Sequence, residues 1–197
     1  MGELNHSKEK HPHSRKYYFD VVMNLLHCQD GVCAYTEEFL CNPKLLSEDK
    51  WANGRYKIKK PRRYGQLDHF NPKLKEDKCW EWDNLFVIHS DINRDKWAKE
   101  VDDILKPDSP EYDPWKLLEY DESLNVFFPH SGLDDESVRE RISRMIEVLQ
   151  LNHDTVRCKR EIFLIEVFER RELGREIKIH QFFTAYQMAL TAKEKEE

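Results

Sequence analysis

The chain has 197 residues, a length typical of one domain or of a compact domain with a helical extension. Its hydrophobic fraction of 39% and aromatic fraction of 12% argue against a wholly disordered chain, although 36% of the residues are charged. The net charge of −6 argues against a globally basic nucleic-acid binder but allows a local basic patch. The sequence has no apolar run of the roughly 20 residues that span a bilayer and no secretory pattern, so we expect a cytoplasmic protein without a membrane partner.

The N-terminal part is predicted to contain one helix between two irregular segments. Residues 1–16 are polar and lack periodicity, which predicts a flexible arm. Residues 17–27 carry apolar side chains at helical spacing and predict a helix. Residues 33–63 include the dipeptides Asn-Pro, Asn-Gly and Lys-Pro, which break regular structure and predict loops.

Two strands followed by a helix are predicted in the middle of the chain. Residues 66–70 alternate between apolar and polar side chains, and residues 85–89 form a second strand candidate. Ser90 offers a cap for a helix over 91–105, in which Trp97 belongs to the apolar face. The order is therefore strand, loop, strand, helix.

The C-terminal part is predicted to be mainly helical. Residues 107–133 indicate a loop region with a weak hairpin around the sequence LNVFF. Helical spacing of apolar residues then predicts three packed helices, over 137–150, 154–172 and 177–193. We expect an α+β fold with the N-terminal helix and a C-terminal helical bundle on either side of the strands.

A basic run precedes the first predicted strand. The sequence RYKIKKPRR contains six cations in nine residues and no acid: Arg55, Lys57, Lys59, Lys60, Arg62 and Arg63. Such a run can neutralise several phosphates, although an isolated basic loop is more often only a solvated surface. Arg94 and Lys96 on the predicted helix are further candidates for phosphate contact, with exposed helix cations as the equal alternative.

The polar residues around the two strands suit phosphodiester hydrolysis. The imidazole of His69 is the natural general base near neutral pH. Oxygen atoms of Asp68 and Asn93 would suit Mg²⁺ or Mn²⁺, with the remaining ligand positions left to water and phosphate. Neighbouring strand residues point to opposite faces, so Asp68 and His69 serve one site only if a bulge or twist intervenes. Asn84 and Asn93 also suit the turn and the helix start that they occupy.

These residues carry a resemblance to a known family. DHFNP, Asn84 and then SDINRDK resemble the HNH nuclease ββα-metal motif, and a wider resemblance over residues 33–160 is to the HNH proteins of Septu-type and retron-associated anti-phage systems. The resemblance implies that Asp68 reaches the metal and that Asn84 ties the loop between the strands and orients His69. It also implies a partner, typically an ATPase subunit, which we assign to the acidic C-terminal third.

The cysteines depart from the family pattern, which usually has two CxxC pairs around a structural zinc. Here the first pair becomes Cys33 with Thr36, and the second becomes His89 with Ile92. With two of four ligands left, we expect no closed zinc site unless Cys28 or Cys41 substitutes. The five cysteines, odd in number, are expected to be reduced thiols.

The sequence thus predicts a metal-dependent HNH endonuclease that acts on DNA, in which water gives its proton to His69 and one ion is held by Asp68 and Asn93. We expect the nuclease domain over 17–133, with its ββα core at about 64–105, and the helical region over 134–193. RNA as substrate and a homo-oligomer stay open. The alternatives are a catalytically inactive HNH-like subunit that binds nucleic acid or protein, and a protein-interaction module whose basic run is incidental.

Overall fold

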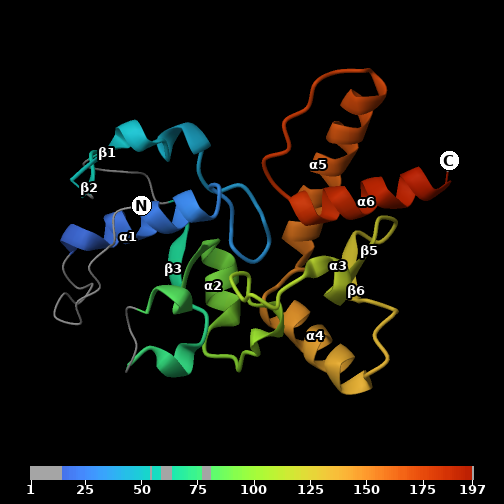
Figure 1. Cartoon of the computed structure of the whole chain (residues 1–197), viewed down its shortest axis with the longest axis horizontal. Helices are drawn as coiled ribbons and strands as arrows, with labels where there is room; N and C mark the ends of the chain where they lie inside the picture. Colours follow the sequence, from blue (N-terminus) through green and yellow to red (C-terminus); the bar gives the residue numbers. More distant parts are fainter. Residues whose placement is uncertain (1–14, 54, 59–63, 77–80, 197) are drawn as a thin grey trace. The chain divides into compact units, whose positions relative to one another are not determined.

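The computed structural model describes residues 15–53, 55–58, 64–76 and 81–196, which group into two compact units (Figure 1). The first unit contains the described residues up to Ala34 and from Phe39 to Glu100, and the second contains residues 35–38 and those from Val101 onward. The described residues form six α-helices and three two-stranded antiparallel sheets, which confirms the α+β class. This grouping divides the chain at residue 100, whereas the sequence pattern predicts a division at residue 133. The predicted arm, apart from its last two residues, lies outside the described residues.

The first unit has two α-helices and two small sheets. Short 3-10 helices lie between them, and the elements in chain order are α1 (Arg15–Cys28), η1 (Pro43–Leu45), η2 (Glu48–Lys50), β1 (Trp51–Ala52), β2 (Arg55–Tyr56), β3 (Gln66–His69), η3 (Pro72–Leu74), η4 (Trp82–Asn84), β4 (Leu85–Ile88) and α2 (Ser90–Lys96). The expected helix and the two expected strands are thus present. β3 and β4 pair antiparallel, as β1 and β2 do.

The core of the first unit lies between α1 and β4. All four residues of β4 are buried, so this strand is apolar on both faces rather than alternating. Leu26 of α1 and Val87 of β4 are fully buried in one cluster. α1 also buries Asp20, whose carboxylate accepts from the backbone amide of Tyr56 at 3.0 Å and from the side chain of Arg55. These contacts fix β2 against α1.

The helix after β4 is shorter than the sequence predicted. α2 ends where Trp97 takes a φ of 44° and a ψ of −125°, because a helix cannot continue through that conformation. The Lys99 amide donates to the Lys96 carbonyl at 3.0 Å and closes a tight turn. The prediction of one helix over 91–105 is therefore wrong beyond Lys96. Trp97 is 79% exposed and does not lie on an apolar core face.

The second unit combines a hairpin with helices. Its elements are η5 (Asp103–Leu105), α3 (Pro114–Leu117), β5 (Leu118–Asp121), β6 (Val126–Pro129), α4 (Glu136–Val148), α5 (Asp154–Glu172) and α6 (Phe183–Glu196). β5 and β6 form the predicted hairpin, and the three C-terminal helices are present, although the last begins at Phe183 rather than near 177. No helix in the described part of the chain is long and apolar enough to cross a membrane.

Candidate functional site

The candidate site lies where α2 packs against β3. The strand pairing is regular, with Asp68 opposite Phe86 and His69 opposite Leu85. Gln66 and Asp68 therefore share one face of β3, and α2 lies over that face because its side chains bond to both of them. The ladder contains no bulge between Gln66 and His69. A regular strand turns the side chains of Asp68 and His69 to opposite faces, so β3 itself does not bring them together.

Asp68 is paired with a buried lysine. The Lys96 ammonium lies 3.0 Å from the Asp68 carboxylate and donates to the His69 backbone carbonyl, also at 3.0 Å. Lys96 is 0% exposed and Asp68 is 6% exposed. Burial lowers the pKa of Lys96, and the Asp68 carboxylate opposes that shift. The alternative that Lys96 is an ordinary exposed helix cation is therefore wrong, because β3 encloses its ammonium. Its assignment as a phosphate contact stays a prediction.

Asn84 holds the loop that follows His69. Its side-chain oxygen accepts from the Asn71 amide at 2.8 Å, and its side-chain nitrogen donates to the Asn71 carbonyl at 3.2 Å. Its backbone carbonyl accepts from the Phe70 amide at 2.9 Å. The backbone around His69 is thus fixed from one side by Asn84 and from the other by Lys96. That Asn84 also orients the ring of His69 stays a prediction.

Asn93 faces β3 one helical turn before Lys96. Its amide nitrogen donates to the side-chain oxygen of Gln66 at 2.9 Å, which leaves its carbonyl oxygen as a candidate cation ligand. Asn93 and Asp68 thus extend from facing elements with the hard oxygen donors that Mg²⁺ prefers. The Asp68 carboxylate already binds one cation, the Lys96 ammonium. A divalent ion would therefore have to share the carboxylate with this ammonium or displace the ammonium. No cluster of three or more His, Cys, Asp or Glu side chains fit for a metal occurs among the described residues.

The basic run is only partly described. Arg55 is tied to the buried Asp20, and the Lys57 ammonium donates to the Asp49 carbonyl at 2.9 Å. The side chain of Arg55 remains 43% exposed, so its pairing with Asp20 still leaves it near solvent. The other predicted phosphate contacts of this run lie outside the described residues, namely Lys59, Lys60, Arg62 and Arg63.

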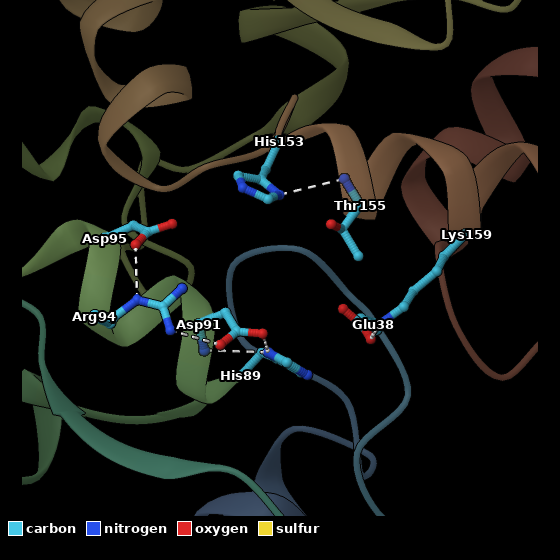
Figure 2. A network of polar contacts seen from close by, with 8 residues as sticks. All are labelled: Glu38, His89, Asp91, Arg94, Asp95, His153, Thr155 and Lys159. Carbon is cyan, nitrogen blue, oxygen red and sulfur yellow. Dashed lines mark hydrogen bonds and ion pairs between the residues drawn. The ribbon is translucent and has the colours of Figure 1, made fainter.

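The start of α2 carries a local polar network. Figure 2 shows the ring of His89 at the Asp91 backbone amide, where its Nδ1 accepts at 3.3 Å and caps the helix. Arg94 is 70% exposed and bonds the carboxylates of Asp91 and Asp95 at 3.1 and 3.2 Å. The two acids therefore pair with the Nε and Nη1 atoms of the guanidinium. Its assignment as a phosphate contact stays a prediction.

A glutamine bonds the region that corresponds to the zinc site of the HNH proteins that the sequence resembles. The side chain of Gln29 donates to the carbonyls of Val32 and Val87, both at 2.8 Å, and accepts from the Val87 amide at 2.9 Å. The Ala34 amide adds a bond to the Val87 carbonyl at 3.2 Å, and Cys33 is fully buried. Direct hydrogen bonds therefore join this loop to β4.

We expect Gln29→Ala to lower the free energy of unfolding by about 1–3 kcal/mol, because it leaves the buried Val87 amide without its acceptor. Asn24→Ala is the matched control, since it removes an amide that bonds only a carbonyl of its own helix. Chemical denaturation of the two variants checks the prediction. Equal stability of both would show that the bonds of Gln29 contribute nothing.

The second unit buries a charged cluster that the sequence analysis missed. Arg160 is 1% exposed, and Glu37 accepts from the amide and hydroxyl of Thr184 at 2.8 and 2.5 Å. Burial raises the pKa of Glu37, and the bonds from Thr184 oppose the shift. Both residues line a cavity of about 20 Å³, onto which the unpartnered hydroxyl of Thr36 also borders. A signal existed in the sequence, because Arg160 occupies the apolar stripe of its helix between Val156 and Phe163.

Two further contacts in this unit are visible in Figure 2. The ammonium of Lys159 pairs with the carboxylate of Glu38, and the ring of His153 caps α5 by accepting from the Thr155 amide at 3.3 Å. Together with Glu37, these contacts secure residues 35–38 and the start of α5. They give structural roles to both charged groups and to the histidine.

No protein-family model matches the chain, and no curated protein matches it. The HNH resemblance therefore rests on the motif residues themselves and on the order of the strands and helix that carry them.

Proposed function

We propose that the first unit is a metal-dependent HNH-type endonuclease that hydrolyses phosphodiester bonds in DNA. The observation that carries the proposal is the small ββα arrangement in which β3 ends at His69, Asn84 clamps the following loop, and α2 turns Asn93 toward β3. Their order along the chain and their place on these elements agree with the resemblance. Hard oxygen donors on facing elements support a divalent ion beside a histidine base.

In this proposal His69 accepts the proton of the attacking water. The His69 backbone is held by the Lys96 ammonium at its carbonyl and by the Phe70–Asn84 bond just after it, which limits the positions open to the ring. Asp68 and Asn93 would hold Mg²⁺ or Mn²⁺, which supplies stabilisation of charge on the phosphate and the leaving oxygen. The cations of the basic run would bind the nucleic-acid backbone without reading sequence.

The wider setting belongs to the same proposal. The resemblance to anti-phage HNH proteins favours a cytoplasmic effector in antiviral defence that works with an ATPase subunit. DNA is the first substrate to test. RNA is the second, because no described residue distinguishes the two by contacting the 2′-hydroxyl group of RNA. A homo-oligomer remains part of the hypothesis to be tested by its mass in solution.

The test is cleavage of supercoiled plasmid by the purified chain in Mg²⁺ or Mn²⁺. We expect nicked or linear product with little sequence preference, lost with EDTA and lost in His69→Ala. His27→Ala is the matched control, because His27 is an exposed histidine of α1 in the same unit and should leave cleavage unchanged. Cleavage that survives in His69→Ala would contradict the assigned base, and cleavage at one short motif would contradict non-specific backbone binding.

One observation favours the second candidate, a catalytically inactive HNH-like subunit that binds nucleic acid or a protein. The Asp68 carboxylate is satisfied by the buried Lys96, and the unbulged β3 turns Asp68 away from the side of His69. DNA binding without metal-dependent cleavage, also in the presence of the ATPase partner, would favour this candidate over the nuclease.

A further inference from the structure

Trp97 is a large aromatic side chain that the core of the first unit does not use. It is 79% exposed, the highest exposed fraction among the large hydrophobic side chains described. It directly follows Lys96, whose ammonium lies inside the unit against the carbonyl of His69. The indole of Trp97 therefore leaves a large aromatic face in solvent, of the kind that stacks on other aromatic groups.

Two contacts place Trp97 close to the loop that follows His69. At one end, the Lys96 ammonium bonds the His69 carbonyl at 3.0 Å. At the other end, the Lys73 ammonium bonds the carboxylate of Glu100 at 2.8 Å. Side-chain bonds therefore link the segments 69–73 and 96–100 at both ends, and Trp97 lies between the two bonds in the second segment.

The backbone offers no structural reason for a tryptophan. With φ of 44° and ψ of −125°, Trp97 takes the first central position of the turn closed by Lys96 and Lys99, a position that favours glycine. A bulky side chain is strained there, and its exposure means that packing returns little. An exposed aromatic ring at a strained backbone position points to a functional role.

We propose that Trp97 stacks on an unpaired base of a polynucleotide strand whose backbone passes His69. This inference rests on the proposed function and names its substrate class, a single strand or an unpaired base at the cleavage position. A base exposes its face only when it is unpaired or unstacked, and an exposed indole binds any of the four bases by stacking. The exposed side chains of Lys75 and Lys99, on the same two segments or just beside them, suit the phosphates of such a strand.

The experiment measures binding separately from cleavage. Fluorescence anisotropy of a labelled oligothymidine is recorded with His69→Ala in EDTA, and then with Trp97→Gly added to that variant. We expect Trp97→Gly to weaken single-strand binding by about 5- to 150-fold while the slope of log Kd against log salt stays the same, because no phosphate contact is lost. The thermal midpoint of Trp97→Gly should equal or exceed that of the parent, since glycine relieves the turn. Trp97→Phe should keep most of the affinity.

The control is Trp115→Ala, which removes a half-exposed tryptophan of the second unit and should leave binding unchanged. The same affinities are measured with single-stranded RNA of matched length and with a blunt DNA duplex, to show which kind of nucleic acid binds. The duplex should show the smallest effect of Trp97→Gly. Unchanged single-strand affinity in Trp97→Gly, as expected if Trp97 instead contacts a protein, overturns the inference. So does a loss accompanied by a changed salt slope. If the protein cleaves plasmid but Trp97→Gly binds single strands as tightly as the parent, the nuclease proposal stands and the stacking role is refuted. If Trp97→Gly weakens binding but the protein cleaves nothing, the nuclease proposal is refuted and the stacking role stands.

Discussion

Lys96→Met is expected to lower the free energy of unfolding by about 3–5 kcal/mol, because it leaves the Asp68 carboxylate buried without its cation. The His69 carbonyl loses a donor in the same step. Urea denaturation followed by circular dichroism measures the change. Lys99→Met is the matched control three residues away, and its exposed side chain should change stability by less than about 0.5 kcal/mol.

The double variant Asp68→Leu with Lys96→Met separates the pair from its surroundings. Replacing both charges by apolar groups removes the unpaired buried carboxylate, so the double variant should be more stable than Lys96→Met alone. A Lys96→Met variant as stable as Lys99→Met would contradict the enclosed ion pair. A double variant no better than the single one would show that Lys96 acts mainly through the His69 carbonyl.

The ion pair also bears on activity. If a divalent ion must share Asp68 with Lys96, removing the ammonium changes the metal concentration that half-saturates cleavage. Lys96→Met, assayed below its melting range, is then expected to need a different Mg²⁺ concentration from the parent protein. This comparison links the structural pair to the proposed nuclease without relying on stability alone.

Arg160→Met is expected to destabilise the second unit by about 3–5 kcal/mol. The guanidinium donates to the side chain and the carbonyl of Asn125, both at 2.8 Å, and to the carbonyl of Leu151 at 3.0 Å. It also lies 4.8 Å from the centre of the Phe127 ring. Methionine fills part of the volume but removes the donor to the backbone oxygens of Asn125 and Leu151, at a cost of about 1–3 kcal/mol for each group. The side-chain oxygen of Asn125 keeps the bond from the Tyr120 hydroxyl.

Arg160→Lys tests whether charge or shape matters, because an ammonium cannot reproduce the three divergent bonds of the planar guanidinium. We expect it to lose most of the stability that Arg160→Met loses. The control is Arg175→Met, an exposed arginine of the same unit, with an expected change below about 0.5 kcal/mol. A thermal midpoint of Arg160→Met within error of Arg175→Met would contradict the buried role of Arg160.

Local patterns in the sequence were enough for most of the secondary structure. The apolar spacing of residues 17–27 and the short apolar run 85–89 correspond to α1 and β4, because each pattern matches the period of the element that buries it. The sequence pattern likewise predicts the order strand, loop, strand, helix. The role of Asn84 in tying the loop is what the resemblance to HNH nucleases implies, and its side chain bonds Asn71 in that loop.

The end of α2 could not be read from the same patterns. Trp97, Val101 and Ile104 repeat at helical spacing, yet Trp97 takes a positive φ and the chain turns. Periodicity reports which residues are apolar and not whether a core exists to cover them. Here the loop after His69 lies against the segment after Lys96, and that contact of distant segments favours a turn over a continued helix.

The sequence by itself determined the α+β class, the elements around the candidate site and the residue types that suit a nuclease, since these depend on local spacing and side-chain chemistry. Only the tertiary structure decided the partners of the charges. Lys96 appears in the sequence as one more helix cation and Arg160 as one more basic residue, but each is enclosed by groups far away along the chain. Burial changes the free energy of a charge more than any local propensity does, and burial is a property of the folded chain.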